Sequence, residues 1–424
     1  MKPALANDCF VHDRQRLRHG EALAILRSRV RPVTGIETVP LDAACGLILA
    51  EPVVAPRDVP AHTNAAVDGY AFAHADYDAE RGAALRVAAR IAAGDAGPHG
   101  LPPGCTARIF TGAVMPQGAD TVAMQEDVET RCDGADTVAL IPAGLKRGAN
   151  RRLAGEDMKA GETVLARGLR LRPQDIAAAA ACGLGSLACH APLRVGVFSS
   201  GEEIIRPGET FRAGKVFDAN APMLKALGQA SGFRCDDLGI LADRAETVSA
   251  RLSEVAPSYD AIITTGGASR GEEDHLALAV RSLGSLHLWQ LAIKPGRPMA
   301  FGQIGDCAVL VLPGNPVAAF VCFLIYARPV LMALAGADWP EPRRFPLPAD
   351  FEITARKTGR REFWRARTHV AEGGVLMVRK YERDGSGLIS SLRDADGLID
   401  MAEDVEEVRR GDMLPFMPFS EFGL

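Results

Sequence analysis

The sequence of 424 residues lacks the features that mark disulfide-rich, zinc-binding and membrane proteins. Its nine cysteines form no Cys-x-x-Cys pair, and such scattered thiols are more typical of buried residues in a reducing cytosol than of a disulfide framework or a zinc site. The longest apolar run, residues 317–325, is well short of the roughly 20 residues that cross a membrane, and a proline precedes it, so we expect a buried helix there. The first residues are polar and contain no signal-peptide core. We therefore expect a cytoplasmic protein with no membrane partner.

An excess of positive charge and the best-known nucleotide-binding loops are also absent. The chain has 48 Lys and Arg against 53 Asp and Glu, a formal net charge of −5, and it has no long basic run, so nucleic acid is not an expected partner. There is no Gly-x-Ser-x-Gly elbow, no Walker-type phosphate loop, and no Gly-x-Gly-x-x-Gly after a predicted strand. A phosphate-binding loop in this protein must therefore have another form.

The chain divides into segments with different patterns. Residues 84–141 hold short alternating strands with frequent Pro and Gly turns, which predicts an all-β module in the middle of the chain. Between residues 194 and 312 strands alternate with helices, which predicts a doubly wound parallel sheet. After a Pro-Leu-Pro linker at residues 346–348 the alternation returns, which predicts a small β domain. Ligands of doubly wound sheets bind at the carboxyl ends of the strands, so functional residues are expected there.

Residues 260–274 contain a strand, a glycine turn and a helix start in succession. The short β-branched run at residues 261–265 predicts a buried strand, and Gly266 and Gly267 then allow a sharp turn and a close approach to a ligand. Such a unit can cradle a phosphate, but three carboxylates that follow it, at residues 272–274, would repel the phosphate unless a cation such as Mg²⁺ lay between them. The other interpretation is a tight turn followed by a solvated acidic helix start.

More unusual turns lie at predicted strand ends in the same block. Glu203, Asp243 and Asp274 each follow a strand end by a few residues, and three carboxylates converging there would form a Mg²⁺ site. Lys294 and Arg297, in a Lys-Pro-Gly-Arg turn, would add positive charge for a phosphate. Solvated loops are the alternative interpretation, since loops carry charge routinely.

Other positions give weaker signals. The turn Pro313-Gly-Asn-Pro316 precedes a helix, and Asn315 is a natural N-cap. Asp68 and Thr111 lie beside strands of the middle module, where spacing alone favours ordinary turn residues. Arg152 and Asp157 belong to a cluster that is more typical of a charged surface than of a site.

Taken together, the motifs of this chain resemble one family. The sequence is similar, over nearly its whole length, to the molybdopterin molybdenumtransferases, which are the bacterial MoeA proteins, and to the C-terminal domain of gephyrin. The resemblance depends on the order of the motifs and not on any one of them. They are Asn64-Ala-Ala-Val-Asp-Gly-Tyr70, Phe110-Thr-Gly-Ala113, Gly155-Glu-Asp157, Phe198-Ser-Ser-Gly-Glu-Glu203, Phe217-Asp-Ala-Asn220, Thr265-Gly-Gly-Ala-Ser-Arg-Gly-Glu-Glu-Asp274, Leu291-Ala-Ile-Lys-Pro-Gly-Arg-Pro298 and Leu312-Pro-Gly-Asn-Pro316.

The resemblance implies an activity. Members of the family insert molybdate into adenylylated molybdopterin, releasing AMP and molybdenum cofactor, with a divalent cation that is usually Mg²⁺. They form an elongated homodimer whose site lies in a cleft between the α/β domain of one subunit and the middle β domain of the other. We therefore expect adenylylated molybdopterin and molybdate as substrates, Mg²⁺ as cofactor, a homodimer with a shared active site, and molybdoenzymes or an adenylyltransferase as protein partners.

The resemblance also assigns roles to individual residues. The catalytic residues would be Asp68, Thr111, Asp157, Glu203, Asp243 and Asp274, of which Glu203, Asp243 and Asp274 would hold the metal. The substrate-binding residues would be Arg152, Gly266, Gly267, Ser269, Lys294, Gly296, Arg297, Pro313, Gly314, Asn315, Pro316 and Ser390.

The expected fold class is α/β plus β in a multi-domain chain. It comprises a doubly wound parallel-sheet molybdopterin-binding domain, a middle β module, a small linking domain and a C-terminal β-barrel-like domain. The expected limits are 1–27 for an N-terminal helix that packs on the α/β domain, 28–54 with 157–188 for the linking domain, 55–156 for the middle β domain, 189–342 for the α/β domain and 343–424 for the C-terminal domain.

Departures from the family pattern leave other functions open. Thr63 replaces an acid, Gln290 replaces a lysine near the pterin phosphate, and Arg297 replaces a lysine while keeping its charge. One alternative is a paralogue that binds and hands over the cofactor without catalysis. Another is a molybdopterin adenylyltransferase, but such proteins resemble only the α/β block and lack the module that carries Asp68 and Thr111. The sequence does not distinguish molybdate from tungstate as the preferred oxyanion.

Overall fold

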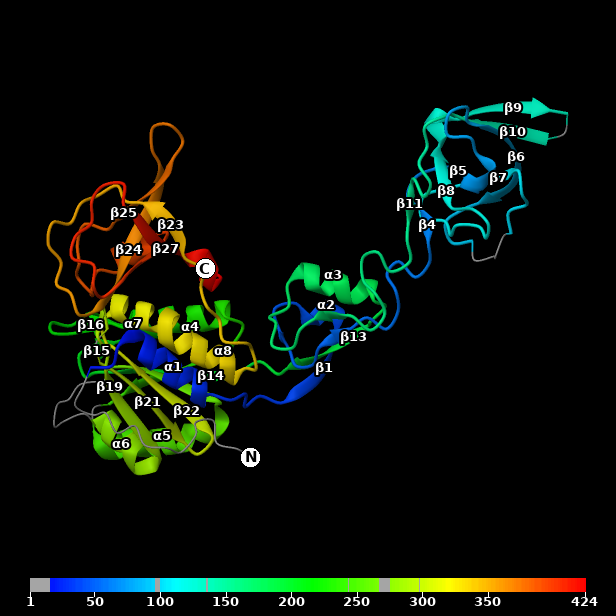
Figure 1. The fold of residues 1–424 in the computed structure, drawn as a ribbon. Coiled ribbons are helices and arrows are strands. Elements are labelled where there is room, and N and C mark those ends of the chain that lie inside the picture. Colours follow the sequence, from blue (N-terminus) through cyan, green and yellow to red (C-terminus); the bar gives the residue numbers. More distant parts are fainter. Residues whose placement is uncertain (1–15, 96–99, 135, 243, 267–274, 297) are drawn as a thin grey trace.

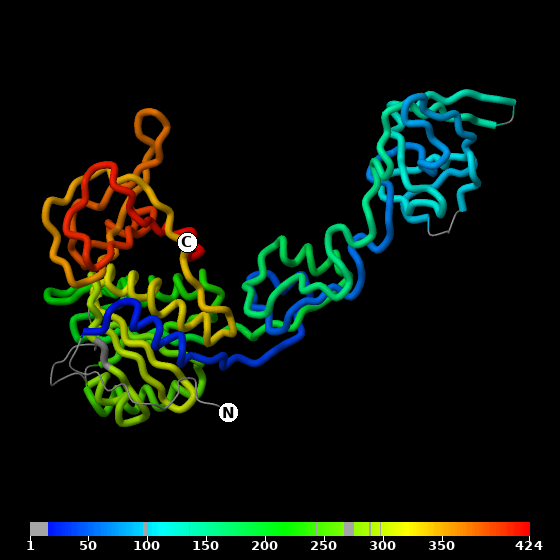
Figure 2. The backbone as a smooth tube through the Cα atoms, viewed as in Figure 1, coloured from blue at the N-terminus to red at the C-terminus, as the bar shows by residue number. Residues whose placement is uncertain are grey.

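The molecule is elongated, with a large globular part at one end and an arm that ends in a separate β domain (Figure 1). The computed structural model describes residues 16–95, 100–134, 136–242, 244–266, 275–296 and 298–424. The globular part contains the α/β domain and the C-terminal β domain. The chain leaves it for the arm soon after the N-terminal helix and returns before the first strand of the α/β domain (Figure 2).

The α/β domain is built on a six-stranded mixed sheet. Its first four strands in sheet order run parallel, as predicted for a doubly wound sheet. At one edge, the fifth strand pairs antiparallel with the fourth, and the sixth pairs antiparallel with the fifth. The sequence analysis did not predict the fifth of these strands. In sheet order the strands are β17 (Arg234–Leu241), β14 (Arg194–Ser200), β18 (Ala261–Thr265), β22 (Cys307–Leu312), β21 (Pro298–Ile304) and β19 (Ser285–Gln290).

Helices cover both faces of this sheet, which confirms the doubly wound fold. Neighbouring strand residues point to opposite faces, so Ile263 and Leu310 belong to one core while Ile262 and Val309 belong to the other. The first core contains residues of α1 (His19–Arg29), α4 (Asn220–Ala230), α7 (Pro316–Cys322), a π-helical turn (Phe323–Ala327) and α8 (Arg328–Leu334). The second contains residues of α5 (Ala245–Val255) and α6 (His275–Leu283).

One continuous helical segment, Pro316–Leu334, is the most apolar of the described residues. With 19 residues and a mean hydropathy of 2.1, it is long and apolar enough to cross a membrane, yet 94% of its most apolar stretch is buried inside the structure. Burial in the first core therefore accounts for its composition, in agreement with the buried helix predicted for residues 317–325.

The C-terminal domain is a β sheet that takes one strand from the α/β part of the chain. The strand β19 ends at Gln290, and the chain then forms a separate strand, β20 (Ile293–Lys294), which pairs with the C-terminal sheet. Lys294 therefore lies where the two domains meet. The other strands are β23 (Phe345–Pro348), β24 (Arg361–Val370), β25 (Leu376–Lys380), β26 (Gly397–Met401) and β27 (Met413–Pro418), and a short helix, α9 (Ser390–Arg393), precedes β26.

The arm consists of a linking domain and a middle β domain that is inserted into it. The linking domain has a three-stranded sheet of β1 (Ile36–Pro40), β13 (Ser186–His190) and β2 (Ile48–Leu49), with α2 (Leu41–Ala44) and α3 (Pro173–Ala181). Two short antiparallel pairs lead outwards and back, β3 (Val53–Val54) with β12 (Thr163–Leu165) and β4 (Asn64–Ala65) with β11 (Arg151–Arg152). The middle sheet contains β5 (Gly69–Phe72), β6 (Ala83–Ile91), β7 (Cys105–Ile109), β8 (Thr121–Met124), β9 (Glu129–Asp133) and β10 (Asp136–Ile141).

Candidate active site

Three turns meet at the carboxyl ends of the parallel strands. Gly266 follows β18 with φ of +87°, and a Cβ atom at this position would lie 2.7 Å from the carbonyl oxygen of Ser200 at the end of β14, so only glycine fits. Gly314 follows β22, and a Cβ atom on it would lie 3.8 Å from the Gly266 Cα. Asn220 donates a hydrogen bond from Nδ2 to the Gly314 carbonyl oxygen at 2.7 Å. The loops after β14, β18 and β22 therefore form one rim of closely spaced backbone.

Of the three carboxylates predicted to hold a metal ion, only Glu203 lies within the described residues. It is exposed just after β14 and forms no ion pair with any residue that the structure describes. Asp243 and Asp274 lie outside the described residues, as do three predicted binding residues, Gly267, Ser269 and Arg297. Within the described part of the chain, no three His, Cys, Asp or Glu side chains are grouped closely enough to hold a metal ion. The three-carboxylate metal site therefore stays a prediction.

Two buried hydroxyl groups lie beneath this rim without a partner. Ser199 and Thr265 are opposite each other in the pairing of β14 with β18, one at 0% and the other at 1% exposure. The Oγ of Ser199 and the Oγ1 of Thr265 form no hydrogen bond with the described residues. Since buried polar groups are normally hydrogen-bonded, these hydroxyls are candidates for contact with a polar group at the strand ends.

A cleft of about 560 Å³ separates the rim from the C-terminal domain. Gly296 shows how tightly its wall is packed, because this residue has φ of +95° and a Cβ atom there would lie 2.3 Å from the Sγ of Cys322. The residues from the α/β side that line the cleft include Gly266, Lys294, Gly296, Pro313, Gly314 and Asn315. Those from the C-terminal domain include Arg360, Trp364, Arg365, Asp384 and Ser386.

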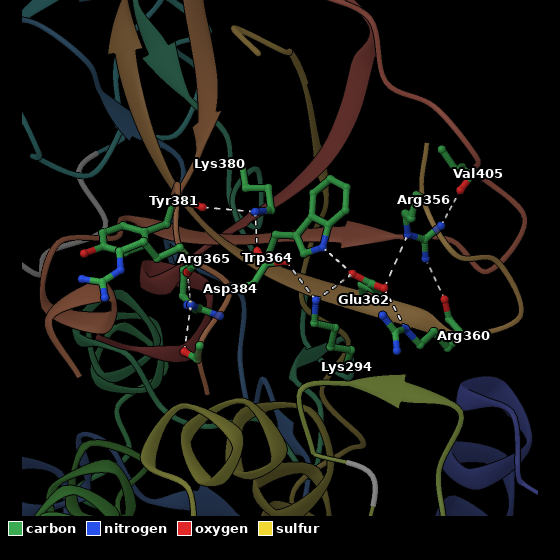
Figure 3. Close-up of polar contacts among 12 residues, drawn as sticks. Lys294, Arg356, Arg360, Glu362, Trp364, Arg365, Lys380, Tyr381, Asp384 and Val405 are labelled. Atoms are coloured by element: carbon green, nitrogen blue, oxygen red, sulfur yellow. Dashed lines mark hydrogen bonds and ion pairs between the residues drawn. The ribbon is translucent and has the colours of Figure 1, made fainter. Parts of the chain in front are cut away.

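Lys294 connects the two walls of the cleft. Its Nζ lies 2.9 Å from Oδ2 of Asp384, and the other carboxylate oxygen of Asp384 pairs with Lys380 (Figure 3). Partial burial alone would raise the pKa of Asp384, but the hydrogen bonds from Lys380 and Lys294 lower it below its ordinary value. Two ammonium groups therefore share one carboxylate, which leaves this part of the cleft with a net positive charge.

Beside this pair, Glu362 is the buried centre of a second network. It is 3% exposed, and its carboxylate accepts hydrogen bonds from Trp364 Nε1 and Arg360 Nε, both at 2.8 Å (Figure 3). Arg356 and Lys294 lie farther from the same carboxylate, at 3.8 and 4.0 Å. Because Arg360 and Trp364 line the C-terminal wall and both donate to this buried carboxylate, Glu362 positions them without lining the cleft itself.

Arg365 lines the cleft and is bound only by neutral acceptors. Its Nε donates to Ser391 Oγ at 2.9 Å, and its Nη2 donates to the carbonyl oxygens of Arg383 and Gly385 at 2.9 and 3.3 Å. The side chain is 6% exposed, and burial lowers its pKa against the opposing effect of the nearby Asp384 carboxylate. Asp384 pairs with Lys294 and Lys380, and no carboxylate among the described residues forms an ion pair with Arg365. A buried guanidinium that lacks a direct ion-pair partner and lines a cleft is suited to bind an oxyanion.

The predicted residues of the middle domain lie far from this cleft within one chain. Oδ1 of Asp68 accepts hydrogen bonds from the backbone N–H and the Oγ1 of Thr111, at 2.8 and 2.7 Å, and these bonds lower the pKa of Asp68. Arg152 is exposed in β11 of the same domain, and Asp157 is exposed where the chain leaves it. Figure 1 shows this domain at the far end of the arm, so the chain does not bring these four residues to its own cleft.

Two of the predicted binding residues differ in detail from what the sequence indicated. Asn315 is the N-cap of α7, but its side chain makes no capping hydrogen bond; the backbone N–H of Val317 instead donates to the Ser386 carbonyl oxygen at 3.0 Å. Ser390 is exposed at the start of α9 and does not line the cleft, whereas its neighbour Ser391 is buried against Arg365. Pro316 begins α7 directly behind the rim.

The sequence analysis missed the residues that the C-terminal domain contributes. The alternation around Phe363-Trp-Arg-Ala-Arg367 correctly indicated a strand, which is β24. Alternation shows that Trp364 and Arg365 point to opposite faces, but it does not say what each face meets. The strand carries several charged residues, so the sequence pattern does not single out Arg365.

Comparisons with known proteins agree with this architecture. Three family models match consecutive parts of the chain: the MoeA N-terminal region (domain I and II) at residues 17–183, the probable molybdopterin binding domain at 196–333, and the MoeA C-terminal region (domain IV) at 348–419. A molybdopterin molybdenumtransferase of Haemophilus influenzae is 32% identical over 388 residues, which is 91% of this chain and 95% of that protein. Molybdopterin molybdenumtransferase 2 of Mycobacterium tuberculosis is 34% identical over 409 residues, covering 93% and 97%.

A solved structure supports the same conclusion. The molybdopterin biosynthesis MoeA protein of Pyrococcus horikoshii superimposes with a TM-score of 0.79 at 28% sequence identity, over 95% of this chain and 100% of that one. The likeness thus includes the arm and the C-terminal domain as well as the α/β domain. This chain belongs to the MoeA family and is a transferase of molybdenum cofactor biosynthesis that acts on molybdopterin.

Proposed function

We propose that this protein inserts molybdate into adenylylated molybdopterin, with release of AMP, and so produces molybdenum cofactor. The observation that carries the proposal is Arg365, a buried guanidinium that lines the cleft and has only neutral acceptors among the described residues. Its charge is available to an oxyanion such as molybdate or phosphate. Lys294 adds a second cation, and Gly266 and Gly314 allow backbone groups to come close to a phosphate.

We further propose that each active site is shared between two chains of a homodimer. Asp68 and Thr111 are held in a defined geometry by two hydrogen bonds, yet they lie at the end of the arm (Figure 1). A second copy of the chain could supply these residues to the cleft, and the length of the arm supports such an exchange. Asp157 and Arg152, nearer the base of the middle domain, would then contact the same substrate.

Mg²⁺ is the proposed cofactor, with Glu203, Asp243 and Asp274 as its ligands. Glu203 fits this role because its carboxylate is exposed at the rim and pairs with no cation among the described residues, and hard cations prefer carboxylate oxygens. The cation would supply positive charge to the phosphoanhydride. In this proposal Arg365 and Lys294 orient the oxyanions of the substrates.

The proposal is tested by AMP release from adenylylated molybdopterin in the presence of molybdate and Mg²⁺. We expect Asp274→Lys to abolish Mg²⁺-dependent AMP release, because it reverses a charge in the proposed metal site. Glu246→Lys, an exposed charge reversal on α5, is the matched control and should leave AMP release unchanged. Undiminished release by Asp274→Lys would contradict the proposal. Tight binding of molybdopterin by the unmodified protein without AMP release would identify it as a carrier.

The location and the protein partners are proposals of the same kind. We propose that the protein works in the cytoplasm and passes its product to molybdoenzymes, with an adenylyltransferase as the source of its substrate. In the part of the chain that the structure describes, the one helix apolar enough for a membrane is buried in the core of the α/β domain, which is consistent with this location.

A further inference from the structure

A second buried arginine, away from the cleft, has no acceptor for its hydrogen bonds. Arg328 begins α8 and is 8% exposed. Its Nε is fully enclosed without a partner, and none of its N–H groups donates to a residue within the described ranges. The guanidinium carbon lies 5.8 Å from the centre of the Phe422 ring, at the distance of a cation–π contact. An arginine keeps its charge and its five donors even when buried, so this arrangement is costly in the ligand-free protein.

The charges around Arg328 make a bound anion favourable. Burial, and secondly the nearby cation Arg170, lower the pKa of Arg328 to about 10. Arg170 itself is held by the carbonyl oxygens of Gly46 and Ala230 and not by a carboxylate. Neither Arg170 nor Arg328 forms an ion pair with a carboxylate among the residues that the structure describes.

The acidic side chains near Arg328 are already engaged. Glu341 pairs with Arg27 at 2.8 Å, and both side chains are largely exposed at the mouth of the adjoining cavity. Asp400 is fully buried and is shared by Arg344 and Arg361. Neither carboxylate forms an ion pair with Arg328, so its guanidinium is left without an ion-pair partner among the described residues.

Arg328 lines a cavity of about 360 Å³ that could admit an anion. The walls come from α1, from the π-helical turn and α8, from the connection at residues 339–344, and from the C-terminal turn that holds Phe422. Apart from the charged groups already named, they are mostly apolar, with Leu23, Leu324 and Trp339 beside Phe422. This volume is within the range of small-molecule sites, and the cavity shares no lining residue with the cleft.

We propose that this cavity binds a small organic carboxylate whose apolar body lies between Trp339, Leu23 and Phe422 while its carboxylate accepts hydrogen bonds from Arg328. One unneutralised guanidinium facing the cavity matches one negative charge, and its planar donors suit the two oxygens of a carboxylate. The apolar walls match an aliphatic or aromatic body and disfavour a compact, strongly hydrated anion such as inorganic phosphate. The ligand would contact the α/β domain and the C-terminal turn together.

The test uses the full-length protein with hexanoate and benzoate as probes. Isothermal titration calorimetry should detect binding of both acids, and both should raise the melting temperature. Hexanamide has the same apolar body without the charge, and inorganic phosphate has the charge without the body, so each should bind at least about tenfold more weakly than hexanoate. Equal binding of hexanoate and hexanamide, or no binding of either acid, would overturn the proposal.

Substitutions then assign the binding to Arg328. Arg328→Met should abolish binding of hexanoate and should raise the melting temperature of the ligand-free protein, since it removes a buried charge without a partner. Arg328→Gln should weaken binding by at least about tenfold and serves as a second variant if the first does not fold. Arg234→Gln, an exposed arginine at the start of β17 that does not line the cavity, is the control and should bind hexanoate as the unmodified protein does. Undiminished binding by a folded Arg328→Met or Arg328→Gln protein would contradict the assignment.

Discussion

The cleft and the far end of the arm hold their functional residues in opposite ways. In the cleft, Lys294 comes from the α/β part of the chain while Glu362 and Arg365 come from β24 of the C-terminal domain, and the ion pairs of Lys294 with Asp384 and Glu362 join the two domains. At the end of the arm, Asp68 and Thr111 come from two strands of one small sheet and are fixed by each other. The cleft needs the whole globular part to form, whereas the pair in the arm needs only its own domain.

This difference bears on how the two regions can cooperate. A pair that is fixed locally can be carried to another chain without losing its geometry, while a network that spans two domains cannot move without breaking. The arm is therefore suited to present its residues to a second copy, and the globular part is suited to receive the substrate. The predictions below separate these two properties.

The strongest test of the comparison is to mix two inactive chains. Asp68→Ala removes the carboxylate that the arm supplies, and Arg365→Gln removes the guanidinium that the cleft supplies. A homodimer of either variant should therefore lose almost all AMP release. Co-expression should restore about a quarter of the unmodified activity, because about half of the dimers are mixed and each has one intact site of two. If both residues served the site of their own chain, co-expression would restore nothing.

Within the cleft, Arg365 is expected to matter more than a neighbouring arginine on the same strand. Arg365→Gln should lower the rate of AMP release by about a hundredfold, the usual effect of removing one preorganised donor to a developing or bound oxyanion. Arg367→Gln is the matched control, since Arg367 is exposed two residues along β24. Equal rates for the two variants would show that the cleft is not the anion site.

Replacing Glu362 tests how much the buried network of the cleft contributes to stability. Glu362→Ala leaves Arg360, Arg356 and Lys294 without their buried carboxylate, and it should lower the free energy of unfolding by about 3 kcal/mol. Urea unfolding followed by tryptophan fluorescence would report it, because Trp364 belongs to the same network. Glu382→Ala, an exposed residue of the same domain, should have almost no effect. Truncation of Asp68 should destabilise much less, since that residue has no buried cation to neutralise.

The smallest expected effect concerns pH. The pKa values of Asp68 and Asp384 are both lowered, the first by Thr111 and the second by Lys380 and Lys294 against the opposing effect of burial. A lowered pKa in the folded state adds stability above the unfolded value of about 4, and this stability is lost as the pH falls through the folded value. Thr111→Val should raise the pKa of Asp68 alone, and Lys294→Met should raise that of Asp384 alone. Carboxyl ¹³C NMR titration would detect both shifts, and a shift of the wrong residue would contradict the separation of the two regions.

Local structure was largely predictable from the sequence, because it depends on neighbouring residues. The strand over residues 261–265 has the predicted limits, and the alternation of strands and helices correctly predicted the doubly wound fold. The strand β21 was not predicted, and its Pro298 and Gly302 are residues that disfavour a strand interior. Its antiparallel pairing with β22 supplies the stabilisation that propensity does not.

The site was less predictable, because its parts are far apart in the sequence. The glycines at 266, 296 and 314 were found through their turns, since a positive φ or a close approach leaves a local signal. Arg365 and Glu362 leave no such signal, as their role arises only when β24 pairs with β20 of the α/β part of the chain. The separation of the middle β domain from the globular part is likewise a property of the whole arm and not of any motif (Figure 2).

The stem of the arm has an evolutionary consequence. Val54 and Thr163, the residues on either side of the inserted middle domain, are direct partners in one antiparallel pair, so their backbones are adjacent. Deleting residues 55–162 and closing the gap with a short turn would leave the hydrophobic cores of the remaining domains untouched. One recombination event could therefore add, remove or exchange the middle β domain. The remaining domains would still fold and would keep their cleft.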